Sequence, residues 1–244
     1  MGHDNNDNDA GQAERPVSVR GQLEYVLKQL AHEDLSRFVL ETAVYDPEFR
    51  EAFLITFSEW LSDPSSEATR YQLRLRNILT QYTNRDGFIS AKNATDLNAA
   101  VSALLHAARK PTTPVRESVD LAMAVMEVMP QLGDRMDDAE GYLYSLMEQT
   151  CTVLLECFDN LQPEAQQQSF ELILGFYGQP EFLDLDLDSF LLILLKDWSR
   201  FDKKRQSACL RVQERMLRES GSDQWRKGYL IEQTNELLKY WKSR

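Results

Sequence analysis

Three acidic side chains gather in the stretch Asp137-Asp-Ala-Glu-Gly141, where Asp137, Asp138 and Glu140 are one to three positions apart. Clustered carboxylates can hold a divalent cation or move a proton in acid–base catalysis. The same residues also suit a helix start, where free N–H groups favour carboxylates, and Glu140 has capping-box spacing from Asp137. We predict a capped helix start here, and an enzyme that uses this cluster remains an alternative.

A second acidic run, Asp184-Leu-Asp-Leu-Asp188, resembles the opening of a calcium-binding loop. Such a loop needs glycine at its sixth position and glutamate at its twelfth, and this chain has Ser189 and Leu195 there. The run therefore predicts helix capping by Asp186 or Asp188.

The histidine and cysteine residues are few and scattered. There are three of each, and none follows another at the spacing of zinc ligands. Nucleophile-elbow, phosphate-loop and metalloprotease motifs are also missing from the sequence. We predict no catalytic residue, no cofactor and no metal. An odd, sparse set of cysteines suits a reducing cytoplasm.

The charge of the chain is uneven. The 27 basic and 39 acidic residues give a net charge of −12, which opposes binding to nucleic acid. Residues 196–244 nevertheless hold 13 basic and 7 acidic residues, a net of +6, so residues 1–195 carry −18. A nucleic-acid-associated regulator that uses the basic segment is the alternative function. Its phosphate contacts would come from Arg200, Lys203, Lys204, Arg211, Arg215 and Arg218.

Helices must position all of these residues, because apolar side chains recur every three to four positions from Leu23 to Trp241. Helix punctuation agrees, with Pro47 and Pro163 at starts, Gly87 at a break and Ser90 at a cap. The pattern predicts about ten to eleven antiparallel helices, the fourth from Ser66 to Tyr82. A bundle and a short α-α superhelical stack both satisfy it.

The domain prediction is a disordered acidic tail at residues 1–16 followed by one helical domain at 17–244, with a sub-boundary near 162–185 as an option. No apolar run has the roughly 20 residues of a membrane span. The four tryptophans are predicted core residues, and Trp241 is the best candidate for a partner contact.

Three stretches carry a resemblance to a known family. They are 27–50, which includes Asp46-Pro-Glu-Phe-Arg50, 71–90, which includes Asp86-Gly-Phe-Ile-Ser90, and 119–143, which includes Asp137-Asp-Ala-Glu-Gly141. Together they look like the helical region after the zinc finger in bacterial SWIM-type zinc-finger proteins. The Cys-x-Cys and Cys-x-His pairs of that finger are missing here. The resemblance implies a helical scaffold for protein contacts that meets a finger-bearing partner in trans.

The predicted function is a non-catalytic helical scaffold that mediates protein–protein interaction. Residues proposed for partner binding are Asp137, Asp138, Glu140, Arg85, Arg211, Arg215 and Trp241.

Overall fold

The computed structural model describes residues 18–57 and 70–243. Throughout these residues the regular structure is helical, and the one β-type pairing in them is an isolated bridge between Ile89 and Met136. The all-α prediction is confirmed, with twelve helices in the described ranges instead of ten to eleven. The predicted tail at 1–16, the helix start at Ser66 and the predicted core residue Trp60 lie outside these ranges.

The chain divides into two compact units, Met1–Asp46 and Pro47–Arg244. The sequence does not predict this boundary. It predicts one helical domain at residues 17–244, with an optional sub-boundary near residues 162–185. In the first unit, α1 (Val19–Gln29) begins after Ser18, whose Oγ accepts a hydrogen bond from the Gly21 N–H, and α2 is His32–Tyr45. Neither helix has a buried residue, which explains the boundary, because helices without a shared core do not form one domain.

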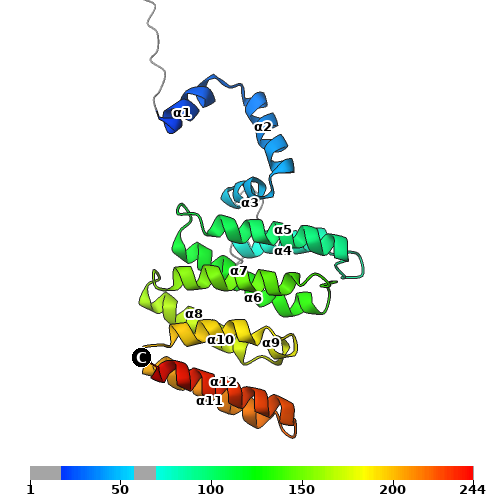
Figure 1. The fold of residues 1–244 in the computed structure, drawn as a ribbon. Coiled ribbons are helices and arrows are strands. Elements are labelled where there is room, and N and C mark those ends of the chain that lie inside the picture. Colours follow the sequence, from blue (N-terminus) through cyan, green and yellow to red (C-terminus); the bar gives the residue numbers. More distant parts are fainter. Residues whose placement is uncertain (1–17, 58–69, 244) are drawn as a thin grey trace, which may run out of the picture. The chain divides into compact units, whose positions relative to one another are not determined.

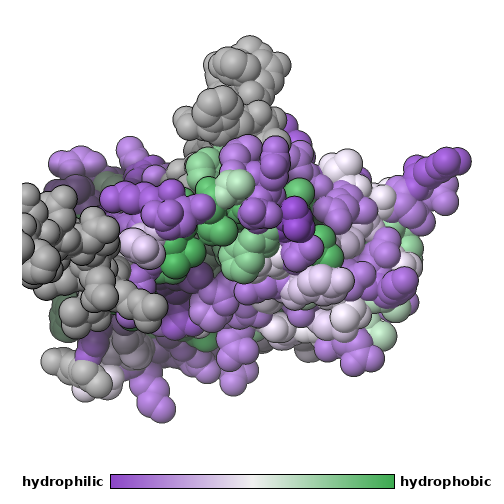
Figure 2. All heavy atoms as spheres, turned by 90° about the horizontal axis from the view of Figure 1, so that it is seen from above, coloured by the Kyte–Doolittle hydropathy of each residue, from purple (hydrophilic) through white to green (hydrophobic). Residues whose placement is uncertain are grey.

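Apolar side chains are correspondingly exposed in this N-terminal unit. Leu23 is 59% and Phe38 is 61% exposed, although both occupy the periodic positions that the sequence assigns to an inner face. Hydrophobic residues also gather among hydrophilic ones on the face drawn in Figure 2. Periodicity therefore found these helices correctly without showing what covers them.

The second unit is a stack of antiparallel helix pairs (Figure 1). The pairs are α4 with α5, α6 with α7, α8 with α10, and α11 with α12; α3 packs on α4 and α5, and α9 is a short link. The bounds are α3 Pro47–Thr56, α4 Arg70–Tyr82, α5 Ala91–Ala108, α6 Val115–Gly133, α7 Tyr142–Phe158, α8 Pro163–Tyr177, α9 Pro180–Asp184, α10 Asp188–Trp198, α11 Lys203–Glu219 and α12 Gln224–Lys242.

One row of helices holds the stack together. α5 packs on α7, α7 on α10 and α10 on α12, and a continuous apolar core runs beneath them. On the other side α4 packs on α6, but α6 and α8 make no comparably close backbone contact. Of the two architectures left open by the sequence, this unit is therefore the stack, and it opens between α6 and α8.

Most predicted helix boundaries are confirmed. α3 and α8 begin at Pro47 and Pro163, Gly87 has the left-handed φ of +80°, and the Ser90 Oγ accepts from the Asn93 N–H at the start of α5. α8 likewise ends at Tyr177, directly before the sequence Gly178-Gln-Pro180, which disfavours continuation of a helix.

One predicted cap is confirmed in part, and another is wrong. The residue before α7 is Gly141, with φ +74°, so Asp137 and Glu140 form no capping box; Asp138 alone accepts from a helix N–H, that of Leu143 at 3.2 Å. The residue before α10 is Leu187, which makes no side-chain cap, and Asp188 lies buried in the first turn. A residue of positive φ lies near both helix starts: Gly141 directly before α7, and Asp186 two residues before Asp188.

No helix in the described ranges combines the length and the apolar character that crossing a membrane requires.

Candidate functional site

A groove of about 650 Å³ lies between α6 and α8, where the stack opens. Its floor is apolar, with Met123 and Ala124 from α6 and Phe176 from α8. Leu172 of α8 lies at its edge with 51% of its surface exposed. The size falls in the range of ligand pockets, and the apolar floor can bury side chains of a binding partner.

A second hollow, of about 330 Å³, lies between α4 and α6. It shares Ala124 and Glu127 with the groove, so the two hollows meet across α6. Because Ala124 has only a methyl group, the ridge between them is low. Apolar residues from α4 (Leu75, Leu79) extend the surface beyond α6.

Charged side chains border the groove. Arg116 Nε is 3.0 Å from the Asp120 carboxylate, so these two charges neutralise each other. The Glu171 carboxylate accepts a hydrogen bond from Gln167 Nε2 at 2.8 Å, and Glu127 is exposed at the meeting point of the hollows. Neither glutamate is paired with a cation in the described part of the chain.

The sequence of α6 explains the groove. Val119, Ala122 and Val125 belong to the stripe that the periodicity assigns to the core, and they are buried. Val119 and Met123, four residues apart, share one side of the helix, and both line the groove together with Ala124, so the apolar stripe of α6 extends from the core to the groove. An amphipathic surface helix has one apolar stripe. The width of the apolar stripe on α6 was the signal that the sequence prediction missed.

The proposed partner-binding residues do not form one site. Arg85 follows α4, and the acidic cluster precedes α7. Backbone hydrogen bonds between Ile89 and residues Arg135 and Asp137, at 2.7 and 2.9 Å, bring these two loops to the same end of the unit. Arg211 and Arg215 are instead on α11, and Trp241 is on α12.

The acidic cluster is at the surface. Asp137 and Glu140 are exposed, and Asp138 binds the start of α7. None of these three residues lines the groove. Among the residues that the structure describes, no group of three or more histidine, cysteine or acidic side chains is arranged to hold a metal ion.

The tryptophans behave differently from one another. Trp198 is buried and stacks on Phe158 with ring centroids 4.0 Å apart, as predicted for the core, whereas Trp225 is 68% exposed, so its core prediction is wrong. Trp241 is half-buried, and its Nε1 donates to Ser199 Oγ at 3.1 Å. That bond ties α12 to the end of α10 and gives Trp241 a structural role.

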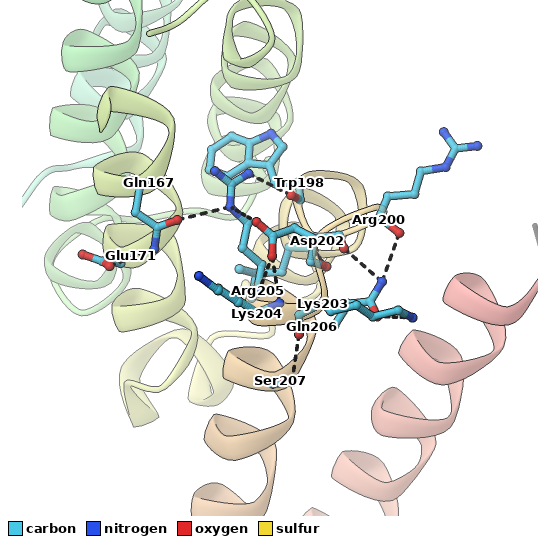
Figure 3. Close-up of polar contacts among 12 residues, drawn as sticks. Gln167, Glu171, Trp198, Arg200, Asp202, Lys203, Lys204, Arg205, Gln206 and Ser207 are labelled. Atoms are coloured by element: carbon cyan, nitrogen blue, oxygen red, sulfur yellow. Dashed lines mark hydrogen bonds and ion pairs between the residues drawn. The ribbon is translucent and has the colours of Figure 1, made fainter. Parts of the chain in front are cut away.

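The basic residues of α11 lie only partly on one side. Lys204, Arg211, Arg215 and Arg218 are exposed, and their spacing of seven, four and three residues places them together on an α-helix. Two of the six predicted residues do not join them. Lys203 Nζ donates to Gln206 Oε1, and the Arg200 guanidinium lies over the Phe201 ring and points away from α11 in Figure 3.

Arg205, between these basic residues, is used for folding. Its Nη1 donates to the Trp198 carbonyl at 3.0 Å, and Asp202 and Gln167 are its other polar neighbours (Figure 3). The guanidinium also lies over the rings of Phe158 and Phe170. The Arg205 guanidinium therefore stacks on aromatic rings and donates hydrogen bonds at the same time, and it joins α11 to α8 and α10.

A buried polar network joins the last two helix pairs. The Asp188 carboxylate is fully buried and accepts hydrogen bonds from Gln233 Nε2 at 2.7 Å and from the Tyr229 hydroxyl at 3.0 Å. The Tyr177 hydroxyl donates to Gln233 and accepts from Gln213 Nε2. Burial raises the pKa of Asp188 above its ordinary value, against the effect of these donors.

Comparisons with known proteins give no match among family models, curated proteins or solved structures. The resemblance to the helical region of SWIM-type proteins therefore stays a prediction.

Proposed function

We propose that this chain is a non-catalytic helical scaffold that binds a segment of another protein in the groove between α6 and α8. The observation that carries the proposal is an apolar floor, including Met123 and Phe176, where the stack opens between α6 and α8. Stacked helix pairs present extended surfaces of this kind to protein partners.

The expected binding strength follows from the side chains that the groove can bury. Two or three apolar residues of a partner, at about 1.5–3 kcal/mol each, must offset the entropy lost on association. A dissociation constant in the micromolar range is the expected result. Exposed Leu172 lies at the edge, where it contacts a bound segment first.

The test is selection of displayed peptides on the full chain. Selected peptides should bind the wild type and lose at least tenfold in affinity on Leu172→Arg, because a charge then replaces an apolar contact. Ile193→Arg is the matched control, since Ile193 is 50% exposed on α10 and does not line the groove. Failure to select any peptide, or equal binding to both variants, would contradict the proposal.

Nucleic-acid binding is the second candidate, and the exposed basic side of α11 favours it. Duplex DNA at low salt should then show a mobility shift that Arg211→Glu with Arg218→Glu abolishes, while Lys92→Glu on α5 does not. Salt should weaken this binding steeply. The net charge of −12 opposes it, and we therefore prefer the groove.

The partner and the compartment are proposed from the amino-acid sequence. We keep a zinc-finger-bearing protein as the proposed partner, which co-purification would test. The cytoplasm is the proposed location, and the free thiols of Cys151, Cys157 and Cys209 suit a reducing compartment.

A further inference from the structure

We propose that the segment bound between α6 and α8 is an amphipathic helix with lysine or arginine beside its apolar side. This inference rests on the proposed function, because it assigns the chemistry of the partner at the same groove.

The charges along the groove select a basic partner. Its lining holds one cation, Arg116, and three carboxylates, which leaves a net charge of −2. Arg116 is already paired with Asp120, so the two remaining carboxylates are those of Glu127 and Glu171. They lie on opposite walls, one on α6 and one on α8, with the apolar floor between them. An apolar side chain flanked by cations complements this arrangement.

The wider field acts in the same direction. Residues 47–195, which belong to the same unit as the groove and include all of it, hold 10 basic and 23 acidic residues, a net charge of −13. Such a field attracts a basic segment over several ångströms and repels an acidic one. The bound segment should therefore associate faster at low salt.

The backbone of the groove indicates that the segment is helical. Both walls are α-helices, whose N–H and C=O groups are paired within each helix, so an extended peptide finds no sheet edge with which to pair. A helix satisfies its own backbone and presents apolar side chains at spacings of three and four residues. Burial of such a side against Met123 and Phe176 then needs no new backbone partner.

The composition of the selected peptides tests the inference separately from the proposed function. We expect sequences with apolar residues three and four positions apart and an excess of lysine and arginine. Peptides that lose affinity on Leu172→Arg but are acidic or neutral would overturn the inference and leave the groove function standing. Selection of no peptide at all would overturn both. Self-association of the chain that Leu172→Arg abolishes would also overturn it, because the occupant would then be a second copy.

Fluorescence anisotropy of one selected basic peptide then measures the charge contribution. Glu127→Gln with Glu171→Gln should weaken binding about fivefold at low salt, as two surface ion pairs would. The control is Glu164→Gln with Glu181→Gln, two exposed glutamates that do not line the groove. An equal loss in both double variants, or no loss in either, would overturn the assignment of Glu127 and Glu171.

Discussion

The α6–α8 opening and the junction between the last two helix pairs differ in what fills the space between neighbouring helices. At the opening the floor is apolar, and no side chain from residues 18–57 or 70–243 fills the hollow. At the junction, the Arg205 guanidinium of α11, which lies over the Phe170 ring of α8, and the network of Asp188 fill the interface. The space between neighbouring helix pairs of one stack is thus filled by side chains at the junction and left as a groove between α6 and α8.

This difference separates stability from binding. Changes at the junction remove buried contacts that hold the fold, so they should lower the free energy of unfolding. Changes at the opening remove contacts that only a partner would use, so they should leave the free energy of unfolding almost unchanged.

Trp198→Ala should have the largest effect on stability. The indole is 4% exposed and stacks on Phe158, so its removal leaves a cavity and should cost about 3–5 kcal/mol. Urea denaturation followed by circular dichroism measures the loss. Trp225→Ala, at a residue 68% exposed, is the control and should cost under about 1 kcal/mol. Equal losses at the two tryptophans would mean that the packing of α10 on α7 is no tighter than the exposed surface, and the contrast with the opening would not hold.

Tyr177→Phe should come next. The ring remains in the core, but the hydroxyl that joins Gln233 to Gln213 is lost, and one buried acceptor and one buried donor lose their partner. A cost of about 1–3 kcal/mol is expected in the same urea experiment. Tyr144→Phe is the control, because Tyr144 is 45% exposed and its hydroxyl bond is 3.4 Å long. A loss no larger than that of the control would show that the network does not stabilise the junction.

Asp188 should make stability depend on pH. Its pKa is raised in the folded state by burial, so the folded chain binds a proton more tightly than the unfolded chain. The stabilisation is complete below the ordinary aspartate pKa of about 3.9 and is lost as the pH rises through the higher folded pKa.

Urea midpoints for the wild type and for Asp188→Asn between pH 4 and pH 7 test this dependence. The difference in unfolding free energy between them should move against the wild type as the pH rises. A difference that stays constant, or one that moves in favour of the wild type, would contradict a raised pKa.

Local chemistry explains why the fold was largely predictable. Pro163 starts α8 and Ser90 caps α5 because these signals act within one turn, and the apolar stripe of α6 acts within one helix. Asp138 caps α7, but the capping box of Asp137 with Glu140 is not formed and Asp188 caps no helix, and a residue of positive φ lies near each of these two helix starts. The apolar side of α1 is exposed for another reason. Periodicity shows that one face of a helix is apolar, but it does not show which element lies against that face.

The site was less predictable because it depends on distances between helices. Glu127 and Glu171 are 44 positions apart, and only the divergence of α6 from α8 sets them on opposite walls. Tyr177, Asp188 and Gln233 likewise come from three helices. Without pairing information, a sequence presents Met123 and Ala124 as ordinary core residues. The proposed partner-binding residues, apart from Trp241, stand out in the sequence by their charge alone. In the structure they lie on separate loops and helices.

Leu172→Ala should have the smallest effect on stability and so sharpens the contrast with Trp198→Ala. Leu172 is 51% exposed in a helix, and alanine is an excellent helix former, so the free energy of unfolding should change by no more than about 0.5 kcal/mol. Its apolar surface becomes useful only when a partner covers it, and truncation should then weaken peptide binding several-fold. Ile193→Ala should change neither quantity appreciably. A loss of stability at Leu172 as large as that at a buried residue would mean that the chain already uses this edge for its own folding, and the opening would then be part of the core.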